Sequence, residues 1–339
     1  MSLLEGGNKT VIGAVEAKRM ELKKFHTARY LHTLRSASRG RFEAEALFMG
    51  IGTPDCPVFR DMYEYSALAC GASLKGAELI LSGQAQLVFN PSGGLHHSGP
   101  EKAAGFCYMN DVALACMVLA DAGKKVFYLD IDVHHGNGVQ DAFYDRNDVM
   151  TISFHQNGRT LFPGTGFVDE IGTGKGKGYS VNVPLPVGTY DQAYMQAFKA
   201  VVPPLFGVFE PDVIVFELGA DTLAGDPLAN LQLTNNTYAD IIHYLLGFDR
   251  PILMTGGGGY NIPNTVRAWA LAWTALCGDD DGHDMNLGLG GVMLESTDWQ
   301  GGLRDRELPV SSQQRRLVEA SIEDTLRKIK ENIFPIHGI

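Results

Sequence analysis

Long hydrophobic runs and an opening signal segment are both missing from this 339-residue chain. No stretch is apolar over enough residues to cross a bilayer, and the start MSLLEGGNKT lacks the apolar centre of a secretory signal. We therefore expect a water-soluble, globular protein that does not act in a membrane. The sequence also has no evident internal repeat or low-complexity segment.

Cysteine is scarce, and its spacing argues against a disulfide framework. The chain has five cysteines, an odd number, and none of them belongs to a CxxC pair. Scattered single cysteines suit a protein that stays in a reducing compartment. We therefore predict a cytoplasmic protein.

The chain also has fewer positively than negatively charged residues. Lysine and arginine number 28 against 39 aspartates and glutamates, which gives a net charge of -11 at pH 7. Because binding to nucleic acid without regard to sequence depends on cationic side chains, this balance argues against direct nucleic-acid binding. It would attract cationic ligands, although many cytoplasmic proteins are this acidic for solubility alone.

The most informative stretch that is present is VFYLDIDVHHGNG at residues 126–138. Its apolar start predicts a buried strand, and acidic and imidazole side chains follow at once. In an open α/β sheet the carboxyl ends of the strands face the crevice in which ligands bind. Asp132 and His134 alternate with Val133, so an extended backbone would point both side chains to one face, as two metal ligands require.

Apolar strands that alternate with helical segments predict an α/β fold with a mostly parallel sheet and helices on both faces. Strands are expected at residues 87–90, from residue 126, and at 149–154, 179–183, 213–217 and 252–255. Helices are expected at residues 14–34, 65–81, 110–122, 190–200, 236–246, 264–277 and 313–332. We assign residues 1–339 to a single domain in which residues 1–10 are flexible or a cloning remnant.

Polar residues gather just after four of the expected strands. These residues are His96 and His97, the segment 130–135, Asp221 after VIVFELGA, and Tyr260 after ILMTGGGG. The topology of a parallel sheet would bring all four groups to one rim. We therefore expect the functional site at this rim.

Three of these residues predict a metal site. A catalytic centre typically uses three protein ligands and leaves one position open for water and substrate. Asp132, His134 and Asp221 form the natural set, because oxygen and nitrogen ligands suit Zn²⁺ and would also accept Fe²⁺. The ion would lower the pKa of a bound water towards ~7 and polarise a carbonyl oxygen.

Neighbouring side chains can transfer the protons that such a reaction needs. His96 and His97 can act as general base and acid near neutral pH. Asp130, on the same strand face as Asp132, would orient one imidazole and raise its basicity. Tyr260, on the glycine-rich GGGGYN loop, would donate its hydroxyl to the oxyanion that forms when water attacks.

Seven blocks of sequence resemble the histone deacetylase superfamily, which includes zinc deacetylases, bacterial acetoin-utilisation proteins and acetylpolyamine amidohydrolases. The blocks lie within residues 25–261 and read FHTARYL, PDCP, GGLHHSGPEKAAGFCYMNDVALA, YLDIDVHHGNGVQDAFY, SFHQNGRTLFPGTG, ELGADTLAGDPLANL and GGGGYN. The resemblance implies an arginase-like α/β fold and hydrolysis of an N-acetylated amine to a free amine and acetate.

The resemblance also implies roles for individual residues. It makes the three metal ligands zinc ligands, His97 the principal general base and acid, and Tyr260 the group that polarises the acetyl carbonyl. His96, paired with Asp130, would tune the hydrogen bonding of the metal-bound water. The walls of a narrow tunnel for an acyl-lysine stem would be Gly105, Phe106, Phe162 and Leu228, with Asp55 holding peptide amides at the rim. Structural K⁺ ions would bind at Asp130 and Ser153 and, in a second place, near Phe143, Val149 and Tyr179.

Two features depart from the pattern of the family. The neutral Asn137 in HHGNG stands where the best-known eukaryotic enzymes have an aspartate beside the second histidine. An amide can still orient His97, but it lacks the negative charge that favours an imidazolium, so we expect a lower pKa for His97 than in those enzymes. The residues before FHTARYL do not resemble the first strand and helix of the family, so this element is either supplied differently or absent from the sequence.

Several functions remain open. A deacetylase acting on acetyl-lysine in a peptide or protein fits the motifs best. An acetylpolyamine amidohydrolase is the nearest rival, because the net acidity would attract a polycation, but no long insertion of the kind that narrows the entrance of those enzymes by dimerisation is evident. A ureohydrolase would need further aspartates for a second metal. A catalytically silent acyl-lysine-binding module would be expected had Tyr260 or the histidine pair been lost, and both are present. The oligomeric state is left open.

Overall fold

The computed structural model describes residues 4, 9–280 and 302–339, and a six-stranded sheet forms its centre. The strand order is β1-β6-β5-β2-β3-β4, and every pair of neighbours is parallel. The strands are β1 (Leu87–Asn90), β2 (Val126–Asp130), β3 (Val149–Gln156), β4 (Ser180–Leu185), β5 (Val213–Glu217) and β6 (Ile252–Thr255). The predicted parallel α/β sheet is confirmed, and all six strands lie where the sequence predicts them.

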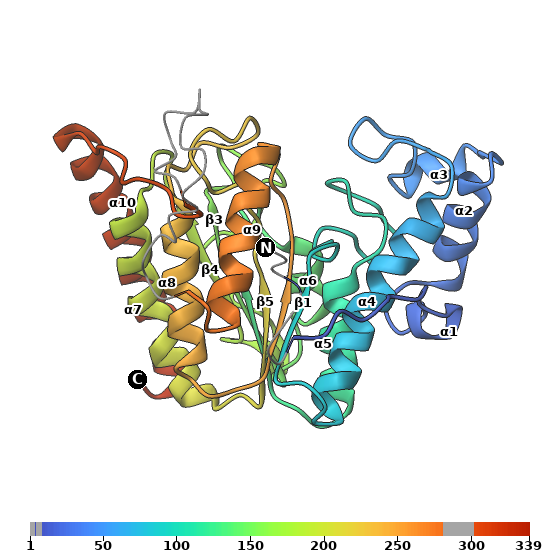
Figure 1. The fold of residues 1–339 in the computed structure, drawn as a ribbon, viewed down its shortest axis with the longest axis horizontal. Helices are drawn as coiled ribbons and strands as arrows, with labels where there is room; N and C mark the ends of the chain where they lie inside the picture. The colour runs from blue at the N-terminus through green and yellow to red at the C-terminus, as the bar shows by residue number, and fades with distance from the viewer. Residues whose placement is uncertain (1–3, 5–8, 281–301) are drawn as a thin grey trace.

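Helices cover both faces of the sheet (Figure 1). One face carries α2 (Ala28–Ser38), α4 (Met62–Leu81) and α5 (Asp111–Asp121). The other carries α7 (Asp191–Phe209), α8 (Asn235–Leu246), α9 (Ile262–Leu276) and α10 (Ser312–Asn332). The short elements are α1 (Arg19–Leu22), α3 (Glu45–Phe48), α6 (Asn137–Ala142), the 3-10 turn η1 (Gly174–Gly176) and α11 (Phe334–His337).

Alternation along the strands divides the interior into two hydrophobic cores. In β2, Val126 and Tyr128 pack with α4 and α5, whereas Phe127 and Leu129 pack with the helices of the other face. This follows from the two-residue period of a strand, and burial of each such side chain stabilises the fold by roughly 1.5–3 kcal/mol. Because β2 is buried on both faces, it is a rigid support for the residues that follow it.

The chain changes direction across the sheet at β2. From β2 the chain continues to β3 and β4 on one side, and it then returns to form β5 on the other side of β2. In doubly wound sheets, ligands bind in the crevice that such a reversal leaves beside the carboxyl ends of the strands. The ends of β2 and β5 therefore mark the expected ligand position.

Two helix predictions were wrong in their extent. The helix expected at residues 14–34 is replaced by α1 and α2, because the Thr27 side chain caps α2 by accepting from the Tyr30 N–H, and the Ala17 N–H bonds to the Ala67 carbonyl instead. Helix α7 continues through Pro203 and Pro204 beyond the expected end at residue 200. Burial of the apolar side chains in its last turns outweighs the hydrogen bonds that the prolines remove.

The expectation for residues 1–10 falls chiefly on residues outside those described. Among the helices that are described, none combines the length and the apolar character needed to span a lipid bilayer.

Candidate active site

The two central strands place four carboxylates side by side. Asp130 and Glu217 are the last residues of β2 and β5, and they are register partners across the sheet. Asp132 lies in the turn after β2, and Asp221 lies in the loop after β5, where its Oδ1 accepts a 2.8 Å hydrogen bond from the Val133 N–H. All four side chains are buried. The predicted rim therefore exists, and it gathers residues that lie far apart in the sequence.

The three predicted metal ligands converge. His134 Nδ1 lies 3.1 Å from Asp132 Oδ1 and 3.0 Å from Asp221 Oδ2, and the donor atoms of the three residues all lie within 4.8 Å of one another. Tetrahedral Zn²⁺ with bonds of about 2.0–2.1 Å holds its ligand atoms about 3.3 Å apart. The spacing and the oxygen and nitrogen donors therefore fit a divalent ion.

Electrostatics also favours a cation at this place. Burial, together with the charge of Asp132, raises the pKa of Asp221 to about 7. Burial lowers the pKa of His134, but hydrogen bonds to Asp132 and Asp221 outweigh it and raise this pKa to about 10. Among the described residues, only histidines form ion pairs with the buried carboxylates of the site. A metal ion would balance the negative charge that no lysine or arginine offsets.

The glycine run 256–259 allows the backbone to approach the ligands closely. The Gly258 N–H donates to Asp132 Oδ2 at 2.6 Å. A Cβ atom added at Gly258 would overlap Asp221 Oδ2 and lie 3.0 Å from Asp132 Oδ2. Glycine is therefore required at this position by the packing of two ligand side chains.

Replacing Gly258 by alanine is expected to weaken metal binding about 10–100-fold, because the methyl group displaces both carboxylates. Competition titration against a fluorescent chelator would measure the affinity. Gly207→Ala is the control, since an added Cβ at this position in α7 meets nothing within 4 Å. Equal affinities in the two variants would contradict the assigned role of Gly258.

A chain of hydrogen bonds joins the two adjacent histidines to their partners. His96 Nδ1 lies 3.0 Å from Asp130 Oδ2, and the Nε2 atoms of His96 and His97 are 3.0 Å apart. His97 Nδ1 lies 2.8 Å from Asn137 Oδ1. The predicted partners of both histidines are therefore in contact with them. With an acceptor at Nδ1, the neutral His97 keeps its proton there, and the lone pair of its Nε2 faces His96 Nε2.

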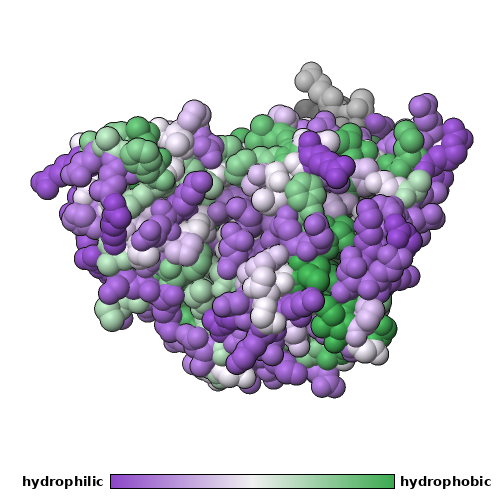
Figure 2. All heavy atoms as spheres, turned by 180° about the vertical axis from the view of Figure 1, so that it is seen from behind, coloured by the Kyte–Doolittle hydropathy of each residue, from purple (hydrophilic) through white to green (hydrophobic). Residues whose placement is uncertain are grey.

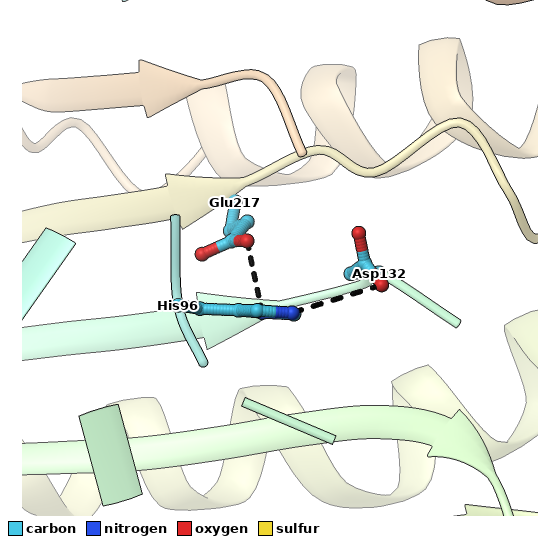
Figure 3. A group of neighbouring side chains, drawn as sticks. All are labelled: His96, Asp132 and Glu217. Carbon is cyan, nitrogen blue, oxygen red and sulfur yellow. Dashed lines mark ion pairs between the residues drawn. The ribbon is translucent and has the colours of Figure 1, made fainter. Parts of the chain in front are cut away.

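Glu217 is a residue of this network that the sequence analysis missed. Its Oε1 lies 2.9 Å from His96 Nδ1, and its Oε2 lies 2.8 Å from the Tyr128 hydroxyl. Figure 3 shows the His96 ring between Glu217 and Asp132. The contact to Asp132 Oδ1 is made by the other ring nitrogen, Nε2, at 3.9 Å. Because the two carboxylates face opposite nitrogens, this group orients the imidazole and does not offer a second three-ligand metal site.

The two histidines differ sharply in basicity. Burial works to lower the pKa of His96, but the negative charges of Glu217 and Asp130 raise it well above its usual value. Burial and the positive charge of His96 hold the pKa of His97 well below its usual value. The pair therefore consists of one cationic and one neutral imidazole.

Exposed aromatic side chains lie beside the buried polar residues. The Phe162 ring lies 5.0 Å from the His97 ring, and the Phe106 ring lies 5.7 Å from the Tyr260 ring. Phe106 and Phe162 are 49% and 46% exposed, which is unusual for large apolar side chains beside a buried polar cluster. Such a surface is suited to an aliphatic ligand.

Tyr260 is held at the site by a second residue that the sequence analysis missed. Asp226 Oδ2 accepts a 2.8 Å hydrogen bond from the Tyr260 N–H. Asp226 Oδ1 accepts from the Leu228 N–H at 2.9 Å, so Leu228, which is 44% exposed, belongs to the same loop network. Burial and nearby carboxylates raise the pKa of Tyr260 well above its usual value, so its hydroxyl keeps its proton.

Asp55 and Gly105 are joined directly. Asp55 Oδ2 accepts from the Gly105 N–H at 3.0 Å, and its Oδ1 accepts from the Thr53 hydroxyl at 2.7 Å. Gly105 has a φ of +52°, and a Cβ added there would overlap the His97 ring. The predicted rim residue thus fixes the segment that packs against His97.

The residues predicted to hold potassium lie in two places. Asp130 and Ser153 are register partners of β2 and β3, and Ser153 Oγ lies 2.8 Å from His155 Nδ1. Phe143 and Val149 are buried in the core beside α5, and the Tyr179 carbonyl accepts from the Thr151 N–H. Both potassium sites therefore stay predictions.

Comparison with known proteins identifies relatives of this chain. Residues 3–276 match the family model of the histone deacetylase domain. Histone deacetylase 8 of Xenopus tropicalis is 41% identical over 260 residues, which cover 76% of this chain and 70% of that protein. The acetoin utilization protein AcuC of Bacillus subtilis is 42% identical over 279 residues, which cover 79% of this chain and 72% of that protein.

Solved structures give the same relationship. The crystal structure of an HDAC homologue from Aquifex aeolicus matches with a TM-score of 0.83 and 34% identity, over 94% of this chain and 88% of that chain. An HDAC homologue in complex with SAHA matches with a TM-score of 0.84 and 33% identity, over the same shares of the two chains. The arginase-like α/β fold that the sequence predicts is therefore confirmed.

Proposed function

This chain belongs to the histone deacetylase family, whose members are deacetylase hydrolases, and we propose that it removes acetyl groups from acetyl-lysine side chains in a zinc-dependent reaction. The observation that carries the proposal is the convergence of three metal-ligand side chains, a histidine pair and a tyrosine at one rim. His97 is held neutral, as a general base must be, and Tyr260 keeps its proton, as a hydrogen-bond donor must. A binding module would have no need for this combination.

Different residues carry out the polarisation, the proton transfers and the stabilisation of the oxyanion. Zn²⁺ bound by Asp132, His134 and Asp221 would supply Lewis-acid polarisation of water and of the acetyl carbonyl. His97 takes the proton of the attacking water at Nε2 and later gives it to the leaving amine, since its Nδ1 is held by Asn137. Tyr260 donates a hydrogen bond from its hydroxyl to the oxyanion that develops on the acetyl oxygen.

His96 supports His97 electrostatically. The carboxylates of Asp130 and Glu217 hold its Nδ1, and its cationic ring adds positive charge beside the developing oxyanion. The aliphatic stem of the substrate lies between Phe106 and Phe162, where burial of each methylene contributes about 0.8 kcal/mol. We also propose that structural K⁺ ions bind at the two groups of residues named for them in the sequence analysis.

A direct assay separates this function from its rivals. Purified, zinc-loaded protein is offered a fluorogenic acetyl-lysine peptide and N-acetylputrescine, with a hydroxamate inhibitor as control. Hydroxamate-sensitive turnover of the peptide is the expected result. Preference for the polyamine would favour the second candidate, an acetylpolyamine amidohydrolase, which the net charge of -11 supports. Zinc binding without turnover of either compound would favour a binding module.

Replacing Tyr260 by phenylalanine is expected to lower kcat about 10²–10³-fold, because the hydroxyl is the donor to the oxyanion. KM should change little, since the ring and its contact with Phe106 remain. Steady-state kinetics on the acetyl-lysine peptide would measure kcat and KM, and zinc analysis of the purified variant would show that the metal is still bound. Undiminished turnover would remove Tyr260 from the mechanism.

Replacing Asn137 by aspartate is expected to move the acidic limb of the pH-rate profile upward by about one pH unit. Burial and the charge of His96 hold the pKa of His97 low, and a carboxylate at position 137 would raise it. A base works only when neutral, so a higher pKa for His97 requires a higher pH for activity. An unchanged acidic limb would count against His97 as the titrating base.

A further inference from the structure

Positive charge in this acidic chain is concentrated in one stretch. Residues 18–41 contain eight lysines and arginines and a single glutamate, a formal charge of +7 in a chain whose net charge is -11. This stretch forms α1, α2 and the segments beside them. Figure 2 shows hydrophilic side chains, interspersed with apolar ones, over this end of the molecule, at the left of that view. A surface designed for solubility alone would not need such segregation.

A cavity of about 320 Å³ lies within this basic end. Four arginines line it, from α1, from α2 and from the segment that follows: Arg19, Arg35, Arg39 and Arg41. His32 and Ser36 complete the α2 side. His32, Arg35, Ser36 and Arg39 are spaced three and four residues apart, so they project from one face of the helix.

The guanidinium groups in this pocket are poorly neutralised. Arg39 makes one loose ion pair, 3.9 Å from Glu64, and the same glutamate accepts from the Ser38 hydroxyl at 3.0 Å. Within the described part of the chain, Arg35 and Arg41 have no carboxylate partner. Arg35 lies over the Tyr63 ring at 5.4 Å, which orients its guanidinium without reducing its charge. Convergence of like charges costs free energy, and a bound anion would offset that cost.

We propose that this pocket binds a small molecule carrying at least two phosphate groups. Arginine presents paired N–H donors that match phosphate oxygens, and one monoanion would leave most of the four arginines unsatisfied. The volume suits a small ligand and not a folded partner, since small-molecule sites enclose about 300–1,000 Å³. None of the lining residues belongs to the candidate active site, which lies beyond the ends of β2 and β5. The pocket is a separate site.

Isothermal titration of the zinc-loaded full chain with inorganic pyrophosphate tests the proposal. The wild-type protein should bind one pyrophosphate, more tightly than inorganic phosphate, and high salt should weaken the binding. Arg35→Gln should bind at least tenfold more weakly. Deacetylation should be unchanged, because Arg35 takes no part in the active site, and the thermal unfolding midpoint should change little, because Arg35 is exposed.

Arg316→Gln is the matched control, since Arg316 is an exposed arginine on α10, outside this pocket. It should bind pyrophosphate as the wild-type protein does. No binding by the wild-type protein would overturn the proposal. Equal affinities of Arg35→Gln and Arg316→Gln would also overturn it, because pyrophosphate would then bind at the zinc or respond to overall charge alone.

Discussion

Asp221→Asn is expected to abolish tight zinc binding and deacetylation while leaving the metal-free protein at least as stable as the wild type. Activity is lost because one of three ligands is replaced by a weak neutral donor. Metal-free stability should rise, on the order of 1 kcal/mol, because burial and, after it, repulsion by the Asp132 carboxylate raise the pKa of Asp221 to about 7. An asparagine Oδ1 can still accept from the Val133 N–H, so the loop keeps its anchor.

Adding zinc should reverse the order of stability. The wild-type protein gains about 2.7 kcal/mol when free zinc exceeds its dissociation constant 100-fold, whereas the variant gains little. Thermal unfolding with and without zinc, together with turnover, measures both effects. Asp191→Asn is the control, since Asp191 is a half-buried carboxylate that accepts from the Thr234 N–H and lies outside the site. A variant that loses stability without metal and retains zinc affinity would show that Asp221 has a structural role only.

The grouping of Asp132, His134 and Asp221 could be predicted from the sequence because each residue lies close to an apolar strand segment. Asp132 and His134 follow the same strand with one residue between them, but they lie in the bend beyond the end of β2, so strand alternation alone does not place them on one face. Asp221 follows another apolar run, so the rule that parallel strands end at one rim was enough to group it with them. The distances and protonation states required the structure, because they depend on which strands are neighbours, and β2 and β5 are far apart in the chain.

The residues that were missed show the limits of the same reasoning. Glu217 ends the apolar run of β5 as Asp130 ends that of β2, so the signal was present, but its role depends on the pairing of these strands. Asp226 acts through the backbone N–H of Tyr260, and no residue pattern predicts a contact to a main-chain group across two loops. The break between α1 and α2 was missed for a similar reason, since the segment before α1 bonds to α4.

Both the sequence and the structure were needed to find the basic pocket. The charge of residues 18–41 is visible in the sequence, but net charge conceals it because the rest of the chain is strongly acidic. Helix α2 then places the side chains of every third or fourth residue together, and α1 and the start of α4 close the pocket around them. The charge of a local segment is therefore a better guide to binding partners than the net charge of the whole chain.

His97→Ala is expected to lower kcat about 10²–10⁴-fold and to leave zinc content and KM nearly unchanged. His96→Ala should cost less, although the two imidazoles touch. The charges of Glu217 and Asp130 raise the pKa of His96 well above its usual value, so its ring is already protonated and cannot accept a proton from water. The pKa of His97 is held low, so this ring is neutral and able to accept one.

The comparison of the two variants therefore tests the division of roles. Single-turnover kinetics on the acetyl-lysine peptide would separate chemistry from product release, and His243→Ala, an exposed histidine on α8, should behave as the wild type. A larger loss for His96→Ala than for His97→Ala would exchange the roles of the two residues. Wild-type turnover by His97→Ala would exclude it as the base. The expected order follows from the two partners of Nδ1, carboxylates for His96 and a neutral amide for His97.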